Sequence, residues 1–248
     1  MKSIMPKILT FWAGSVFIIS MLFFIPPIWI TGFLPEPRRT ELLIRLSKAW
    51  ISVFFFFSGI RLTVRGKENF KPGQNYIVVC NHNSMMDVPI SSPWIPGANK
   101  TIAKMEVAKV PVFNIIYKRG AILVDRKSDR SRRESYLRMK QVLDMGMHMC
   151  IYPEGTRNKT EKPLKEFHDG AFKLAEDTGK PLMPALIFGT RRMLPSDKSF
   201  YFRPGKLEMH FLEPIEVKPG DTTKELKERT FRIMWEHYEK NQDRFQFE

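Results

Sequence analysis

Seven short apolar runs recur along the chain after residue 60, and stretches with helical periodicity separate them. Each run is bounded nearby by Gly, Pro or Asn, and runs of this length and character are typical of β-strands. Alternation of strands with helices predicts an α/β fold, a layered domain with a mixed β-sheet flanked by helices. The predicted strands are 61–65, 76–80, 100–104, 120–124, 148–152, 182–188 and 206–212.

Capping signals delimit three of the helices. A capping box from Ser131 to Glu134 predicts the start of a helix over 131–144, which should end at Gly146. A second helix is expected over 164–178, before Gly179. The last helix should run from a Thr222–Glu225 box to about residue 241, with an apolar face toward the core. That face carries Leu226, Phe231, Trp235 and Tyr238.

The N-terminal part of the chain is apolar and carries no charge from Ile8 to Leu34. Residues 8–25 would be roughly 27 Å long as a helix, close to a bilayer core of about 30 Å. We expect Pro26-Pro27 to end this helix, because proline removes a backbone donor and clashes with the preceding turn. A second apolar stretch, 49–60, is too short to span a bilayer. We therefore predict a two-helix membrane anchor joined through the charged segment 35–41, with residues 1–60 as the anchor and 61–248 as the catalytic domain.

The orientation of this anchor is suggested by its flanking charges. Lys2 and Lys7 precede the apolar segment and Arg38 and Arg39 follow it, which favours a hairpin whose two ends share the cytoplasmic side. Whether 8–25 crosses the bilayer or lies in one leaflet stays open. A cleaved signal peptide is disfavoured because no A-x-A processing site follows.

The charge balance favours an anionic partner. The net charge is +14, and residues 100–140 hold 12 basic against 4 acidic side chains. Such a field attracts anionic lipid or an acidic carrier protein. Nucleic acid is disfavoured, because the chain has no zinc-finger spacing, RNA-recognition aromatic signature or basic-region heptads. The two cysteines, Cys80 and Cys150, lie in apolar runs and imply no disulfide framework, and the histidines have no metal-ligand spacing.

Two polar clusters directly follow apolar runs. The first is Asn81-His82-Asn83-Ser84-Met85-Met86-Asp87, and the second begins at Tyr152-Pro153-Glu154. Positions five apart lie about 140° apart on an ideal helix, so His82 and Asp87 cannot meet on one helix face. His82 must therefore lie in the loop before a helix, with Asn83 or Ser84 as N-cap and Asp87 in the first or second turn. A histidine with a carboxylate orienter is suited to taking a proton from a hydroxyl.

Several motifs together resemble the family of glycerolipid acyltransferases that convert 1-acyl-glycerol-3-phosphate to phosphatidic acid. The resemblance covers roughly residues 60–215, and the order and spacing of the motifs agree along the chain. The chain departs from the family at His168 and Asp169, where lysine is more usual after the phenylalanine. The motifs are the NHxxxxD block at 81–87, Ala103 to Pro111, the block Gly120 to Arg126, EGTR at 154–157 and the F-x-x-G-A stretch at 167–171.

The resemblance implies a mechanism and a set of site residues. His82 Nε2 would take the proton from the sn-2 hydroxyl as that oxygen attacks an acyl-thioester, with Asp87 on the other ring nitrogen. The thioester of acyl carrier protein or coenzyme A supplies the activation, so no metal or cofactor is expected. Phosphate of the acceptor would be bound by basic side chains and backbone donors, because guanidinium groups pair with phosphate in bidentate fashion. The expected substrate-binding residues are Lys104, Arg126, Glu154, Gly155, Thr156 and Arg157.

Rival interpretations remain at this stage. Cys80 could carry an acyl group, although its apolar neighbours favour a buried thiol. Ser84 is a weak nucleophile candidate because the chain has no G-x-S-x-G elbow. The acceptor could instead be glycerol-3-phosphate or another lysolipid, and a non-catalytic lipid-binding membrane protein with this fold is the alternative of a different class. The sequence leaves chain-length preference, donor carrier and oligomeric state open.

Overall fold

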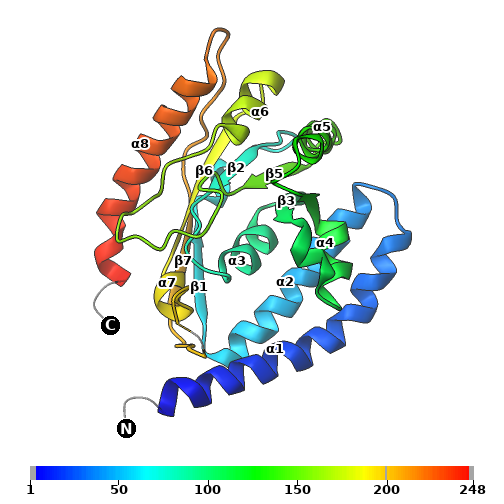
Figure 1. Cartoon of the computed structure of the whole chain (residues 1–248), viewed down its shortest axis with the longest axis vertical. Helices are drawn as coiled ribbons and strands as arrows, with labels where there is room; N and C mark the ends of the chain where they lie inside the picture. Colours follow the sequence, from blue (N-terminus) through cyan, green and yellow to red (C-terminus); the bar gives the residue numbers. More distant parts are fainter. Residues whose placement is uncertain (1–3, 199, 246–248) are drawn as a thin grey trace.

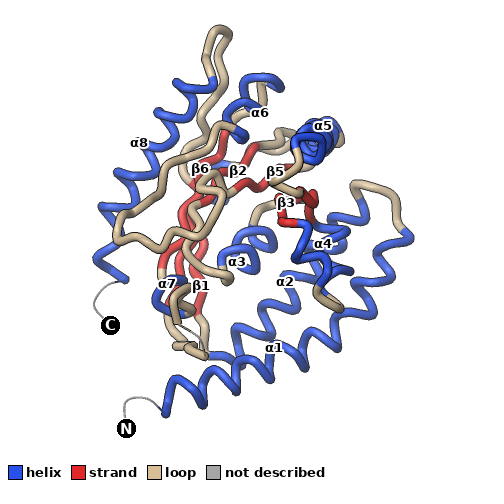
Figure 2. Tube along the Cα trace, in the orientation of Figure 1, coloured by secondary structure: helices blue, strands red, loops and turns tan. Residues whose placement is uncertain are grey.

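The computed structural model describes residues 4–198 and 200–245. Seven strands form one sheet in the order β1-β7-β6-β2-β5-β3-β4 (Figures 1 and 2). All neighbouring strands are parallel except β6 and β7, so the sheet is mixed as predicted. The predicted strands agree with the observed ones to within one residue at each end. They are β1 (Arg61–Arg65), β2 (Ile77–Cys80), β3 (Asn99–Lys104), β4 (Ala121–Val124), β5 (His148–Ile151), β6 (Leu182–Phe188) and β7 (Lys206–Phe211).

Helices cover both faces of the sheet, which gives the layered α/β fold that the sequence predicts. Alternate side chains of β2 point to opposite faces, because the side-chain period of a strand is two. Val78 and Cys80 pack with one cluster and Ile77 and Val79 with the other. The first cluster is completed by α2 (Arg38–Ser58), α3 (Asp87–Trp94) and α7 (Thr190–Met193), with α4 (Phe113–Gly120) packed against it. The second is completed by α5 (Asp129–Asp144), α6 (Gly170–Thr178) and α8 (Thr223–Asn241).

The first helix does not end at the prolines. Helix α1 runs over Ile4–Ile30 and contains Pro26 and Pro27, so the predicted break is wrong. The prolines lack the backbone donors that would reach the carbonyls of Leu22 and Phe23, but their fixed φ suits a helix. The final turn is held by the fully buried Ile28 and by the guanidinium of Arg119, which donates to the carbonyl of Trp29 at 3.3 Å.

The second predicted anchor helix also differs. Residues 49–60 do not form a short apolar element of their own, because α2 begins at Arg38 and continues to Ser58. This helix is amphipathic, and its buried face, with Trp50 and Phe54, packs against α1, α3 and α4. The expected charged linker is correspondingly shortened to the few residues between the 3₁₀ turn Thr31–Phe33 and Arg38.

Only α1, extended through the following turn to Phe33, is long and apolar enough to cross a membrane among the residues described. Its outer face exposes large apolar side chains, with Phe11 80% and Phe23 77% exposed. An exposed apolar surface of this length indicates a membrane location. Lys7 lies in this helix, whereas Lys2 lies outside the described residues.

The helix ends bear out part of the capping analysis. The Thr222–Glu225 capping box is present at the start of α8, and Gly179 ends α6 in a left-handed conformation. Helix α5 starts earlier than predicted, because Ser128 rather than Ser131 is the N-cap. Helix α6 starts six residues later than predicted, since residues before it form a loop that contacts the candidate site.

Candidate active site

The loop 81–86 connects the carboxyl end of β2 to α3, and its start is fixed to the sheet. The Asn81 amide donates to the Ile187 carbonyl at 3.0 Å and accepts from the Ile187 N–H at 2.7 Å. The side chain therefore continues the pairing of β2 with β6 by one residue. His82 follows directly and emerges at the edge of the sheet where parallel strands end, which is the usual place for ligand binding in α/β folds.

Asp87 is the first residue of α3 and is fully buried. Its Oδ2 accepts from His82 Nδ1 at 2.9 Å and from the backbone N–H of Asn83 at 2.6 Å and of Ser84 at 2.7 Å. Its Oδ1 accepts from the Thr190 hydroxyl at 2.7 Å. An ionised carboxylate oxygen can only accept hydrogen bonds, so the ring hydrogen of His82 is assigned to Nδ1. The other ring nitrogen, Nε2, then has its lone pair available to accept a proton.

The N-cap interpretation of this loop is wrong. Neither Asn83 nor Ser84 caps α3, because the N-cap position is Met86 and has no side-chain cap. The aspartate accepts from the loop amides instead, while the Ser84 hydroxyl donates to the Leu194 carbonyl at 2.8 Å. The loop is thus closed around Asp87, and this closure holds His82 beside the carboxylate.

His82 lines a cavity of about 690 Å³ at the carboxyl edge of the sheet. Lys104, Arg126 and Arg157 line the same cavity, together with Gly155 and Thr156. These residues come from the ends of β3 and β4 and from the loop after β5, so three strand ends converge on one space. Of the eight residues predicted from the sequence, six line the cavity, whereas Asp87 and Glu154 are buried behind it.

Glu154 accepts a hydrogen bond from the loop 81–86. Its Oε1 accepts from the His82 backbone N–H at 2.8 Å, and its Oε2 accepts from the Lys165 N–H at 3.0 Å. The residue is 1% exposed, and burial raises the pKa of its carboxyl to about 7. Both oxygens are engaged by backbone donors, so Glu154 positions His82 and the 160–168 loop rather than facing the cavity.

The turn after Glu154 needs a glycine. Gly155 has a φ of +67°, and a Cβ there would lie 2.8 Å from the His168 ring. Its carbonyl accepts a hydrogen bond from the Arg126 guanidinium, and the Thr156 hydroxyl accepts from Lys165 Nζ at 2.8 Å. Burial lowers the pKa of Arg126, which remains a cation because the ordinary pKa of a guanidinium is so high. Arg126 and Thr156 are thereby fixed, while the Arg157 side chain forms no hydrogen bond or ion pair with the described residues.

Residues that the sequence analysis missed also hold the site. Arg191 donates to the Asn83 amide oxygen at 3.3 Å and to the Asn158 carbonyl at 3.2 Å, and so joins the two motif loops. With Thr190 it follows Gly189 at the end of β6. Gly189-Thr190-Arg191 directly follows an apolar run, as do the polar clusters that begin at Asn81 and Tyr152. The same sequence signal therefore marks all three loops.

The rival nucleophiles lie away from the cavity. Cys80 is fully buried, and its Sγ lies 3.8 Å from Cys150 Sγ. The hydrogen bond with Cys150 and burial both raise the pKa of the Cys80 thiol well above its ordinary value, which disfavours the thiolate. The Tyr152 ring lies at a centroid distance of 4.6 Å from the His82 ring and is tilted by 37° relative to it. Among residues 4–198 and 200–245, no group of three or more His, Cys, Asp or Glu is placed to hold a metal ion.

A histidine–aspartate pair thus lies at the strand ends of a layered α/β sheet, beside a cavity lined by arginine and lysine side chains. The acyltransferase family model matches residues 61–188, which is more than half of the chain, and the chain belongs to this family.

Individual relatives agree with this assignment. The chain is 29% identical over 173 residues to the probable 1-acyl-sn-glycerol-3-phosphate acyltransferase of Mycoplasma pneumoniae, covering 66% of this chain and 63% of that protein. It is 30% identical to the human 1-acyl-sn-glycerol-3-phosphate acyltransferase alpha over 165 residues, 66% of this chain and 58% of that one. Thus the chain spans about three fifths of the length of such curated relatives. The crystal structure of the 1-acyl-sn-glycerophosphate acyltransferase of Thermotoga maritima is similar over 97% of both chains, with 26% identity and a TM-score of 0.82.

Proposed function

We propose that this chain transfers an acyl group from an acyl-thioester to the sn-2 hydroxyl of 1-acyl-glycerol-3-phosphate, giving phosphatidic acid in phospholipid biosynthesis. The observation that carries the proposal is the His82–Asp87 pair at 2.9 Å, with the histidine lining a cavity that five lysine and arginine side chains also line. The same reaction is supported by the names of the relatives and of the protein with the similar crystal structure.

His82 is the general base in this mechanism. Nε2 takes the proton of the acceptor hydroxyl while the hydroxyl oxygen attacks the thioester carbonyl, and the thiol of the carrier leaves. Asp87, which accepts from Nδ1, holds the ring and stabilises the imidazolium that forms. The thioester supplies the activation, so the proposal includes no metal or cofactor.

Acceptor phosphate is assigned to the basic side of the cavity. Arg126, Arg157 and Lys104 line it, and guanidinium groups bind phosphate oxygens in bidentate fashion. Thr156 adds a hydroxyl there, and Gly155 allows backbone to approach the ligand. Glu154 contributes by fixing His82, because its two oxygens are both occupied by backbone donors.

An apolar cavity of about 100 Å³ adjoins this basic one and offers apolar contact to the first part of an acyl chain. Val88, Thr101 and Tyr117 line both cavities. The inner wall is formed by apolar side chains of α1 and α2, including Phe17 and Trp50. An acceptor whose phosphate and acyl chain lie in the two adjoining spaces would bring its hydroxyl near His82. This arrangement favours a lysolipid over glycerol-3-phosphate, which has no acyl chain.

Binding of α1 to the membrane would hold the enzyme next to its lipid substrate. The catalytic domain is proposed to face the cytoplasm, where the donor is acyl carrier protein or coenzyme A thioester. Both donors are anionic, and the basic excess of residues 100–140 suits either.

The test is acyl transfer from a labelled acyl-thioester in membranes that contain the full chain, with 1-acyl-glycerol-3-phosphate, glycerol-3-phosphate and lysophospholipids offered in parallel. His82→Ala is expected to lower phosphatidic acid formation by about 10²- to 10⁴-fold, the usual contribution of a general base. Arg232→Ala, an exposed site on α8, is the control and should keep full activity. An active His82→Ala enzyme would contradict the role of His82, and a wild-type chain that acylates no acceptor would contradict the reaction.

A further inference from the structure

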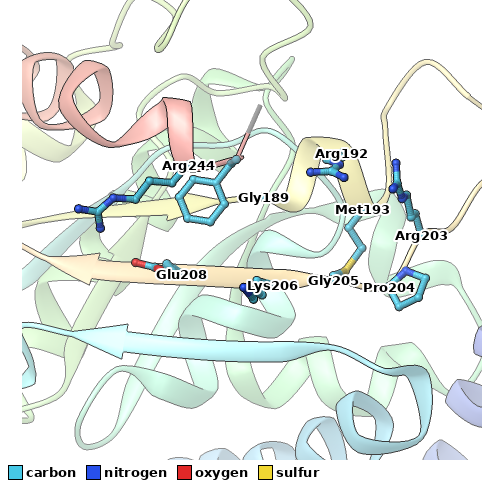
Figure 3. Close-up of a pocket in the computed structure, with 10 residues that line it drawn as sticks. Gly189, Arg192, Met193, Arg203, Pro204, Gly205, Lys206, Glu208 and Arg244 are labelled. Carbon is cyan, nitrogen blue, oxygen red and sulfur yellow. The ribbon is translucent and has the colours of Figure 1, made fainter. Parts of the chain in front are cut away.

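A second cavity of about 330 Å³ lies at the same edge of the sheet, where α7 meets the start of β7. It is enclosed by α7, the first residues of β7 and the turn Gln242–Phe245. Figure 3 shows Arg192 and Met193 on α7 above β7, with Arg203 and Pro204 at one end of the cavity and Arg244 toward the other. A space of this size is typical of small-ligand sites.

The lining of this cavity is strongly basic. Arg192, Arg203 and Arg244 contribute cations, and among the described residues that line the cavity Glu208 is the one that carries a carboxylate. That carboxylate is already engaged, because it lies 3.2 Å from Arg65 Nε and 2.7 Å from His210 Nε2. Within the described part of the chain, the three arginines form no ion pair. The cavity therefore has a net positive charge that suits a phosphate group.

The cavity also adjoins the apolar surface of the N-terminal helices. A side chain at Gly59, which ends α2, would lie 3.3 Å from Pro204 in the cavity wall, and the Arg61 N–H donates to the Gly205 carbonyl at 3.0 Å. Exposed aromatic side chains lie close in sequence to both Gly59 and Pro204. These are Phe56 (78% exposed) and Phe57 (55%) at the end of α2, and Phe200 (82%) in the loop between α7 and β7.

We propose that this cavity binds the phosphate group of an anionic membrane lipid, separately from the substrate cavity at His82. Exposed phenylalanines would enter the apolar part of the membrane while the arginines contact headgroup phosphate, an arrangement typical of the membrane interface. An acidic protein would pair with the arginines but would leave Phe200 exposed to water. The lipid accounts for both the charge and the aromatic rim.

Bound lipid would also connect to catalysis through α7. Thr190 contacts Asp87 and Arg191 contacts Asn83, whereas the next residue, Arg192, lines the basic cavity. Helix α7 is only four residues long, so a ligand on Arg192 would restrict the same short segment that holds the catalytic aspartate. The lipid site is therefore placed to stabilise the geometry of the His82–Asp87 loop.

The experiment measures lipid binding rather than activity, so it is independent of the proposed reaction. The full chain is prepared in neutral-detergent micelles with phosphatidylcholine or, at equal mole fraction, phosphatidylglycerol, and its Tm and amide hydrogen exchange are measured. Phosphatidylglycerol should raise the wild-type Tm by about 3–6 °C near saturation. Exchange should slow in 189–205.

Matched variants separate the site from general attraction by charge. Arg192→Gln with Arg203→Gln should abolish both the Tm rise and the local protection, and Arg203→Gln alone serves if the double variant folds poorly. Lys67→Gln with Lys71→Gln removes the same charge from exposed positions beyond the far end of β1 and should behave as wild type.

Three results would overturn the proposal. An equal loss in both double variants would mean that only net charge matters. An equal Tm rise with inorganic phosphate or glycerol phosphate at the same anion concentration would assign the cavity to a soluble phosphate compound. Protection of 189–205 by an acidic carrier protein but not by phosphatidylglycerol would assign it to protein docking.

Discussion

The hydroxyl of Thr190 donates to Oδ1 of Asp87 at 2.7 Å, on the oxygen that His82 does not use. Both residues are fully buried, and Thr190 is more than a hundred positions away in sequence. The bond therefore joins the end of β6 to the start of α3, and it fixes the plane of the carboxylate that orients the histidine. Thr190 is a positioning residue that acts through Asp87.

Thr190→Val should lower kcat by about 10-fold with little change in KM, because losing one partner of a buried hydrogen bond costs about 1–3 kcal/mol. Thr190→Ser keeps the hydroxyl and should recover most of the rate. Steady-state kinetics of acyl transfer with both variants check this, and thermal unfolding controls for stability. Equal losses in the serine and valine variants would point to packing of the methyl group instead.

Glu154 should make stability fall as pH rises toward neutrality. Burial raises its pKa to about 7 in the folded chain from an ordinary 4.5. The folded state therefore binds this proton more tightly, so the contribution is fully present below about pH 4.5 and is lost as pH rises through about 7. The difference is roughly 3 kcal/mol.

Comparison with Glu154→Gln isolates this contribution. The glutamine variant has no proton to lose, so wild-type stability should decline relative to it between about pH 4 and pH 8. His148, whose pKa burial lowers to about 4, titrates in an overlapping window but is present in both proteins and cancels. Denaturant unfolding over this range gives the two profiles, and parallel curves would refute the assignment.

The sequence predicts the sheet well because apolar runs bounded by Gly, Pro or Asn mark each strand, and both faces of β2 are buried. The sequence also predicts where His82 and Asp87 lie. Because residues five apart cannot meet on one helix face, His82 has to lie in the loop before the helix that carries Asp87. The sequence-based prediction fails at Pro26-Pro27, where local propensity argues for a break but the buried Ile28 and the Arg119 contact hold the helix. Long-range packing of this kind has no local signature.

The supporting contacts of the site are harder to predict. Thr190 and Arg191 reach the catalytic loop only because β6 lies beside β2, and strand order is not encoded in any short motif. The assignment of Ser131 as N-cap fails for a local reason. Its hydroxyl accepts from the Asp125 N–H at 3.0 Å, while Ser128 three residues earlier caps the helix.

Arg157 should act mainly in acceptor binding. Its side chain lines the cavity and forms no hydrogen bond or ion pair within residues 4–198 and 200–245, so Arg157→Gln should leave Tm unchanged. The KM for 1-acyl-glycerol-3-phosphate should rise about 10- to 100-fold, since hydrogen bonds to charged groups contribute about 1.5–3 kcal/mol. Arg157→Lys should recover the activity only in part because lysine cannot bind phosphate in bidentate fashion. Kinetics that vary acceptor at saturating thioester test this, and an unchanged KM would remove Arg157 from the phosphate site.

Helix α1 should have one face that stabilises the fold and another that binds membrane. The Phe17 ring lies 5.0 Å from Trp50, 5.3 Å from Phe54 and 6.0 Å from Phe113, measured between centroids. Phe17→Ala should therefore lower the free energy of unfolding by about 3 kcal/mol.

Phe23 provides the matched change on the opposite face. It is 77% exposed, and among the described residues its ring contacts the ring of the adjacent Phe24. Phe23→Ala should change stability by less than about 0.5 kcal/mol, yet weaken vesicle association by about 10-fold or more, because a buried phenylalanine contributes about 1.5–3 kcal/mol. Unfolding in detergent and flotation with vesicles separate the two effects. The unfolding measurement contains no lipid. Equal losses of stability in both variants would therefore mean that protein covers the exposed face of α1.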